Sequence, residues 1–579
     1  MNSGRIFPLL LLAGSFFLTS CSVEITSSPS SSPGSTPSMS SAQNLDQYGG
    51  YQDLPVPGGA TGFFRVGKLG TRWVFATPEG NAFWLRAVYV VNWIDGGDTY
   101  RNKIGAKYAG SGDGAFWIQA IRRLRSWGFN ALGEYASTHA LPISAYGGPP
   151  NSEKLPFIWI FNASYYGLGS STPHKSLYKG IDTLTNPTVY LGIFPDVFDP
   201  AFTTNVDSFV SDFGGSSAAG SVFGGAANLN ASPWLIGLTT DDGDYTTGFG
   251  PGPEGAASQG KTHPHLGWVA AVTAPTQASG DFTNLFGRVV TYSDTKVYTK
   301  YALRDFLQAK YGTIGAMNTA WGSTYTTFDS DGGWKVGNGF LDENGRHPWI
   351  GTDHAFLSTA NPQVKADLDA FLFRIAEKYF SVYATKIRQY LPNHLVFTPA
   401  TMQAGVRREI LQAAGQYVDA IQSSGVPGGP TYPLYRTICD VSGKPVFVWT
   451  TLTAQADSNL TNPDLTGWGP NYNKATQALR GQAYADEIAN LVQLQATNGD
   501  YCILGIDWWE WVDKVVGGEN MNFGLVSRLD NAYDGKEAVV TPGTDPWGYP
   551  TGGEARDYGD FLSAVTGANN LVYNTIAGP

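Results

Sequence analysis

The sequence predicts an α/β protein whose main domain is a (β/α)₈ barrel. Short apolar runs of strand length recur along the chain, and stretches with helical periodicity separate them. Strands that alternate with helices form parallel sheets, and eight such units within 579 residues suit a barrel that carries insertions. The predicted strands are Phe83–Val91, Phe129–Gly133, Pro156–Phe161, Trp234–Thr239, Leu395–Pro399, Tyr417–Gln422, Pro445–Thr451 and Tyr501–Asp507.

Residues 1–20 are typical of an export signal. Arg5 supplies a positive start, and Phe7 to Leu18 form an apolar stretch too short to cross a bilayer as a mature helix. The sequence LTSC that ends at Cys21 resembles a bacterial lipoprotein box, which implies cleavage before Cys21 and acylation of its thiol. A plain secretory signal is the alternative. We expect a lipid-anchored protein of the cell envelope, at the outer membrane or cell surface.

The rest of the chain divides into a tether and one large domain. Residues 21–45 are rich in Ser, Thr and Pro and predict a disordered tether, and residues 46–579 form the barrel domain. From Gly62 the turn signals predict a small β-hairpin region before the first barrel strand. The Gly- and Pro-rich stretch Asp241–Lys300 predicts a long loop after the fourth strand. The predicted helices are Ala115–Trp127, Tyr301–Tyr311, Val364–Tyr390 and Lys474–Thr497.

Composition narrows the class of partner. The formal charge is −11 and no block of Lys and Arg occurs, which argues against nucleic acid. An acidic, aromatic-rich chain suits a neutral polysaccharide, although a solvated acidic surface gives the same composition. No Cys/His cluster has the spacing of a zinc site, and we expect no metal and no cofactor. Cys439 and Cys502 could be two buried thiols or one disulfide.

The ends of the predicted strands hold the candidate site, because in a barrel they converge on one mouth. The last strand ends in Asp507, Trp508, Trp509, Glu510 and Trp511. Indole faces pack on sugar rings, and carboxylates bind hydroxyl groups or perform acid–base catalysis. The other candidates for substrate contact or catalysis are Trp93, Asn130, Glu134, Tyr135, Asp241, Asp242, Asp244 and Trp449.

Several segments resemble agarase-like and β-galactosidase-like glycoside hydrolases. They include the TPEGN turn within Trp73–Val91, FPDVFDPAF at Phe194–Phe202, the helix and NTAWG element of Leu303–Tyr325, and NFGLV within Gly505–Tyr533. These segments occur in the order found in that family. The resemblance implies a (β/α)₈ barrel that hydrolyses a β-linked polysaccharide or oligosaccharide containing galactose or glucose, by means of two carboxyl groups.

Two positions depart from the family pattern. After the fourth strand the family carries Asp-Asn-Glu, and this chain has Asp241-Asp242-Gly243-Asp244. At the end of the seventh strand the resemblance calls for a Glu nucleophile, and this chain has Thr450-Thr451. We therefore expect Asp242 or Asp244 as the acid and Glu510 as the nucleophile or base.

Three explanations of the missing nucleophile remain open. Its role has moved to Glu510 or Asp457; or the enzyme is inverting; or catalysis is lost and the barrel is a surface glycan-binding protein.

Overall fold

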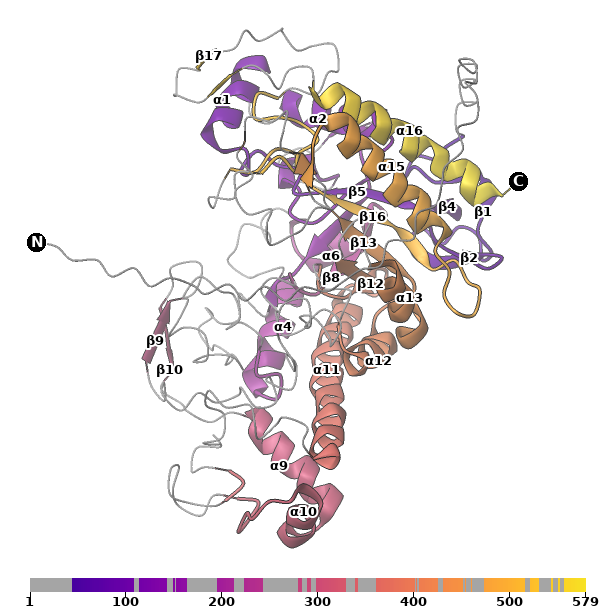
Figure 1. Ribbon diagram of the computed structural model, residues 1–579. Coiled ribbons are helices and arrows are strands. Elements are labelled where there is room, and N and C mark those ends of the chain that lie inside the picture. The colour runs from indigo at the N-terminus through magenta and orange to yellow at the C-terminus, as the bar shows by residue number, and fades with distance from the viewer. Residues whose placement is uncertain are drawn as a thin grey trace, which may run out of the picture. The chain divides into compact units, whose positions relative to one another are not determined.

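The computed structural model contains the predicted barrel (Figure 1). Eight parallel strands pair in the order β11-β8-β7-β6-β5-β16-β13-β12, and a parallel bridge between Phe397 and Ala420 joins the two outer strands of this ring. All eight predicted strands are confirmed. Their bounds are β5 Leu85–Tyr89, β6 Ala131–Leu132, β7 Phe157–Ile160, β8 Leu235–Thr239, β11 Leu395–Phe397, β12 Ile421–Ser424, β13 Val446–Thr450 and β16 Ile503–Trp509.

The structure describes most residues of the compact unit Gln43–Pro579. The described ranges are 44–108, 114–142, 149–150, 153–163, 195–212, 223–242, 280–283, 289–292, 298–329, 339–341, 361–400, 402, 406–424, 431–450, 453–454, 460, 473–515, 521–530, 543–544, 550–551 and 557–578. The predicted signal, the tether up to residue 43 and Cys21 lie outside them, as do Asp244, Asp457 and most of the predicted long loop. Within these ranges no helix is both long and apolar enough to cross a membrane.

Helices follow the strands as the periodicity predicts. The predicted stripe Trp117, Ile121, Leu124 and Trp127 is buried on and just after α2. The sequence missed the C-terminal helix α16, which runs beside α15 (Figure 1). Gly481 of α15 permits this close approach, because an added Cβ would lie 2.7 Å from Cβ of Ala564. The helices are α1 Gly97–Lys107, α2 Gly114–Ser126, α4 Pro200–Asp212, α6 Ala226–Asn230, α9 Tyr298–Tyr311, α10 Ile314–Trp321, α11 Pro362–Tyr390, α12 Arg408–Tyr417, α13 Thr431–Ser442, α15 Gln477–Gln493 and α16 Asp557–Ala577.

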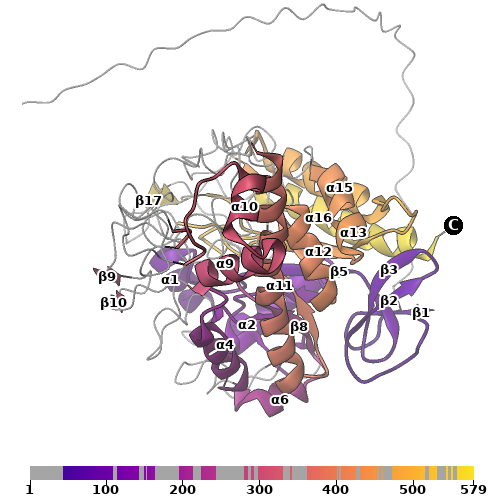
Figure 2. The same ribbon diagram turned by 90° about the horizontal axis from the view of Figure 1, so that it is seen from below.

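The predicted N-terminal β region is a four-stranded antiparallel sheet of order β1-β4-β3-β2 (Figure 2). Its strands are β1 Tyr51–Pro55, β2 Arg65–Leu69, β3 Arg72–Ala76 and β4 Asn81–Phe83. Phe75 of β3 contacts Phe397 and Phe447, with ring centroids 6.1 and 6.3 Å apart. Phe397 and Phe447 contact each other across β12, so both rings lie inside the barrel. The sheet thus closes the end of the barrel where the strands begin.

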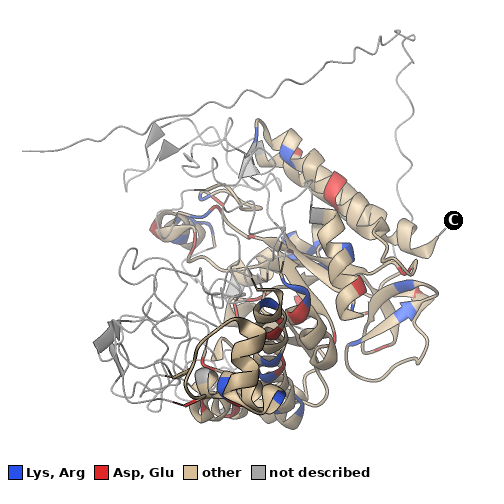
Figure 3. Ribbon diagram, turned by 60° about the horizontal axis from the view of Figure 1, so that its bottom comes forward, with Lys and Arg blue, Asp and Glu red and all other residues tan. Residues whose placement is uncertain are grey.

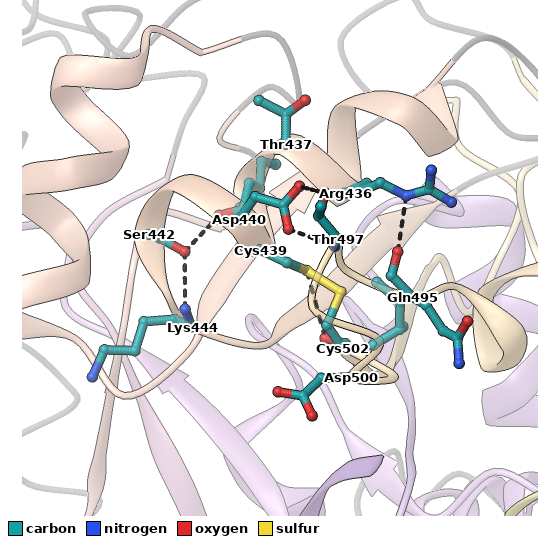
Figure 4. The surroundings of a disulfide bond; sticks show 12 residues. Arg436, Thr437, Cys439, Asp440, Ser442, Lys444, Gln495, Thr497, Asp500 and Cys502 are labelled. Carbon is teal, nitrogen blue, oxygen red and sulfur yellow. Dashed lines mark hydrogen bonds between the residues drawn. A yellow bond between two sulfur atoms is a disulfide. The ribbon is translucent and has the colours of Figure 1, made fainter. Parts of the chain in front are cut away.

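A disulfide links the outer helices to the last barrel strand. Cys439 of α13 is bonded to Cys502, which directly precedes β16, and their Cα atoms lie 6.4 Å apart (Figure 4). The sequence left two thiols and one disulfide equally open. Asp440 fastens the same loop, because its carboxylate accepts hydrogen bonds from the backbone N–H and the hydroxyl group of Thr497. Two adjacent residues of α13 therefore hold the chain that leads into β16.

Candidate active site

The upper half of the barrel interior is a polar layer formed by alternate strands. The Thr239 hydroxyl of β8 lies 2.5 Å from Oε1 of Glu134, which follows β6, and 3.2 Å from Oε1 of Gln422 on β12. Because these strands are not neighbours in the sheet, the three side chains meet inside the barrel. The fourth alternate strand adds Asp507 of β16. In many barrels such a layer consists of branched apolar residues, so this polar one marks a specialised interior.

Glu134 and Asp507 form a buried carboxyl pair. Both side chains are fully buried, and an added Cβ at Gly133 would collide with the Asp507 carboxyl group. Burial raises the pKa of Asp507 well above its usual value, and the adjacent Glu134 carboxylate raises it further. Like charges in contact repel each other, so Asp507 holds its proton more tightly than an isolated carboxyl group does.

We expect this retained proton to make the stability of the fold depend on pH. The folded chain binds the proton more tightly than the unfolded chain, so the free energy of unfolding falls as pH rises above about 4. Asp507→Asn should remove that part of the slope, worth about 1.4 kcal/mol for each unit by which the pKa is raised. Urea unfolding at pH 5 and at pH 8 gives the free energy of unfolding at each pH, and the difference between the two values gives the slope. Equal slopes in the variant and the wild type would contradict the shared proton.

Aromatic side chains cover the polar layer at the carboxyl ends of the strands. Tyr89 of β5 contacts Tyr135 and Trp449, with ring centroids 5.6 and 6.1 Å apart. The ring centroids of Trp449 on β13 and Trp509 on β16 lie 5.0 Å apart. Trp509 also stacks on Phe523, with ring centroids 4.4 Å apart. Tyr135, Trp449 and Trp509 are partly exposed. They supply the apolar faces that sugar rings pack against.

Asp242 lies among these rings. Its Oδ2 accepts hydrogen bonds from the hydroxyl groups of Tyr135, at 3.1 Å, and Tyr89, at 3.4 Å. Asn162 holds the same network, because its Oδ1 accepts from the Asp242 backbone N–H at 2.7 Å and its Nδ2 donates to the Tyr135 hydroxyl oxygen. Asn162 and Tyr89 were not among the site residues predicted from the sequence. Asn162 directly follows the third predicted strand, Pro156–Phe161. A search for polar residues at the ends of the predicted strands would therefore have found it.

The backbone is strained where the first three barrel strands end. Val90, Tyr135 and Asn162 have φ angles of 55°, 58° and 52°. Only glycine adopts this left-handed region readily, and β-branched Val90 is the costliest case. Such strain persists where the surrounding structure enforces it, typically at functional sites. Here two of the three residues, Tyr135 and Asn162, form hydrogen bonds with Asp242.

The second predicted catalytic residue, Glu510, directly follows β16. Its side chain is fully buried, and its backbone carbonyl accepts a hydrogen bond from Leu525 N–H. It therefore stands one residue beyond Trp509, at the same end of the barrel as Asp242. Within the described ranges no three His, Cys, Asp or Glu side chains are grouped to hold a metal ion.

Comparison with known proteins shows which barrels this one resembles. No protein-family model matches the chain. β-Agarase B of Vibrio sp. (strain JT0107) is 22% identical over 566 residues, which cover 84% of this chain and 48% of the agarase. The solved structure of PfGH50B aligns with a TM-score of 0.64 at 18% identity, over 92% of this chain and 69% of that one. This chain is an agarase-like (β/α)₈ barrel.

Two further relatives agree with that assignment. A solved exo-β-agarase aligns with a TM-score of 0.64 at 17% identity, over 93% of this chain and 68% of that one. β-Agarase A of the same Vibrio strain is 20% identical over 424 residues, covering 71% of this chain and 34% of the agarase. The agarase-like chain spans about half the length of β-agarase B and about a third of β-agarase A.

Three predicted sugar-binding residues of the agarase-like barrel face the helices instead of the mouth. The Asp241 carboxylate accepts from the hydroxyl groups of Tyr379 and Tyr383 on α11, at 2.6 and 2.5 Å. Trp508 packs between α15 and α16, against Tyr484 and Phe561. The indole N–H of Trp511 donates to the Tyr100 hydroxyl at 2.8 Å. Asp241, Trp508 and Trp511 are almost entirely buried, and we assign them to the core.

Asn130 also lies away from Asp242, and Trp93 contacts helix α1. Asn130 precedes β6, and its side chain bonds the backbone of Trp84 and Arg86. It therefore holds the start of the barrel strands together, at the end opposite the mouth. Trp93 follows β5 and lies under the guanidinium group of Arg101 on α1, 4.5 Å from its ring centroid. The structure thus brings Tyr135, Asp242, Trp449 and Trp509 together, with Glu134 and Asp507 beneath them and Glu510 beside Trp509.

Proposed function

We propose that this chain hydrolyses a β-linked polysaccharide or oligosaccharide containing galactose or glucose. The observation that carries the proposal is the position of Asp242, whose carboxylate is held by two tyrosine hydroxyl groups beside the partly exposed rings of Trp449 and Trp509. The likeness to two β-agarases supports the choice of polymer. Asp242 and Glu510 are the two carboxyl groups that such hydrolysis needs.

The hydrogen bonds favour a division of roles between these two residues. Two hydroxyl groups donate to one oxygen of Asp242, so this carboxylate is the acceptor in the network. Asp242 is therefore in place to take a proton from one of these hydroxyl groups. Glu510, enclosed at the end of β16, then donates the proton to the leaving oxygen. This reverses the roles that the sequence suggested, and it keeps both residues in the reaction.

The test uses residues 43–579, which form the compact unit. Galactans, agaroses and β-glucans are each incubated with this protein, and both new reducing ends and binding are measured. Release of reducing ends from one polymer is the expected result. If no polymer is cleaved or bound at all, the proposal fails.

A non-catalytic glycan-binding barrel is the second candidate. It is favoured by the end of β13, where the sequence has Thr450-Thr451 at the place where the resemblance calls for a glutamate. Binding of one polymer without any cleavage would establish this candidate and would mean that Asp242 and Glu510 only hold the sugar.

We also propose that the chain is exported and anchored by lipid at Cys21. A disulfide between Cys439 and Cys502 fits an oxidising compartment outside the cytosol. In a Gram-negative host the wild type should appear in the outer-membrane fraction, and Cys21→Ser should be released from the membrane. Mass spectrometry of the N-terminal peptide checks the acyl group. A Cys21→Ser variant that stays in the membrane fraction would contradict the anchor.

A further inference from the structure

We propose that Tyr135 is the nucleophile of this barrel and that Asp242 is its general base. The inference rests on the proposed hydrolase function and supplies the group that the sequence lacks at the end of β13. A nucleophile of this kind needs a base within hydrogen-bond reach and a further group that orients the base. Tyr135, Asp242 and Tyr89 have this arrangement, with oxygen–oxygen distances of 3.1 Å and 3.4 Å at Asp242 Oδ2.

Three hydrogen bonds connect Asn162, Tyr135 and Asp242. The backbone N–H of Asp242 can only donate, so the atom of Asn162 that faces it is the carbonyl oxygen Oδ1. The other amide atom of Asn162 is then Nδ2, which donates to the Tyr135 oxygen. The Tyr135 hydroxyl group donates to Oδ2 of Asp242 at 3.1 Å. Asn162 thus stabilises negative charge on the phenol oxygen while Asp242 is in place to remove its proton.

Tyr89 cannot take the same role. It is fully buried, and burial together with the negative charge of Asp242 raises its pKa well above 10. Tyr89 therefore remains a neutral donor that orients Asp242. Tyr135 is partly exposed and has a strained backbone, with a φ angle of 58°. Of the two tyrosines on Asp242, Tyr135 is therefore the more exposed.

The reaction balances with Tyr135, Asp242, Glu510 and one water molecule. The Tyr135 oxygen bonds to the anomeric carbon, its proton passes to Asp242, and the glycosidic C–O bond breaks. The leaving oxygen takes a proton from Glu510. Water then attacks the anomeric carbon and gives a proton to Glu510, while the Tyr135 oxygen leaves and regains its proton from Asp242. One water is consumed, one glycosidic bond is broken, and two displacements retain the anomeric configuration.

Trapping of the covalent intermediate tests the assignment. Residues 43–579 are incubated with 2-deoxy-2-fluoro-β-galactosyl and β-glucosyl fluorides, digested, and analysed by mass spectrometry. We expect one fluoroglycosyl group on the peptide that contains Tyr135. Tyr135→Phe should keep the ring contact with Tyr89, lose the label and lower kcat/KM by at least about 10³-fold. NMR of the first product of the wild type should show the β anomer.

Tyr383→Phe is the matched control, because it removes the same kind of tyrosine–aspartate bond from the neighbouring Asp241. It should keep the label and most of the activity. An active wild type that is labelled on a carboxylate, that inverts the anomeric centre, or that loses little activity in Tyr135→Phe overturns the assignment alone. A wild type that neither cleaves a polymer nor takes a label overturns the hydrolase proposal as well.

Discussion

Glu510→Gln and Asp242→Asn should each lower the kcat of polysaccharide hydrolysis by roughly 10²- to 10⁴-fold. Each substitution keeps the size of the side chain and removes its capacity to exchange a proton. In Asp242→Asn the amide oxygen can still accept from the Tyr135 and Tyr89 hydroxyl groups, so the aromatic mouth should stay in place. Reducing-end assays at saturating polymer give kcat, and circular dichroism confirms the fold.

Asp241→Asn is the control for this experiment. It alters the adjacent carboxylate, which faces Tyr379 and Tyr383 of α11 and not the mouth. We expect kcat near that of the wild type and a lower thermal midpoint, because two hydrogen bonds to a buried charge are weakened. Wild-type kcat in both Glu510→Gln and Asp242→Asn would remove these two residues from the reaction.

The sequence was sufficient to predict the barrel, because strands buried on both faces form continuous apolar runs that local inspection finds. It could not say which side chains at the strand ends point inward. In β16, Asp507 and Trp509 face the interior and Trp508 faces the helices, and a shift of one residue would exchange them. That register is set by pairing with β5 and β13, which are distant in sequence.

The end of β8 shows a second limit. Strand alternation stops at Thr239, and both Thr240 and Asp241 then bond to tyrosines of α11, which leaves Asp242 to reach the mouth. No local pattern separates Asp241 from Asp242. The Asn162 contact likewise joins residues 80 positions apart, so the sequence could supply the carboxylate but not the amide that orients it. Positive and negative residues are interspersed along the described helices (Figure 3), which gives no further pointer to the site.

Removal of the Cys439–Cys502 disulfide should cause the largest loss of stability expected from any change outside the site. The bond closes a loop with a sequence separation of 63 residues, and the chain-entropy estimate for such a loop is about 4 kcal/mol. We expect the double variant Cys439→Ala/Cys502→Ala to unfold at lower urea concentration than the wild type. Reductant should shift the wild type in the same direction and leave the double variant unchanged.

Asp440→Ala separates the covalent link from the hydrogen bonds beside it. This variant loses the two bonds to Thr497 and keeps the disulfide, so its unfolding midpoint should fall by much less than that of the double cysteine variant. A wild type whose midpoint does not respond to reductant would contradict a stabilising disulfide. The bond precedes β16 directly, and β16 carries Asp507 and Trp509, so heat inactivation should accelerate in parallel with unfolding. A change that destabilises β16 should then also disrupt the mouth, because Asp507 and Trp509 lie on this strand.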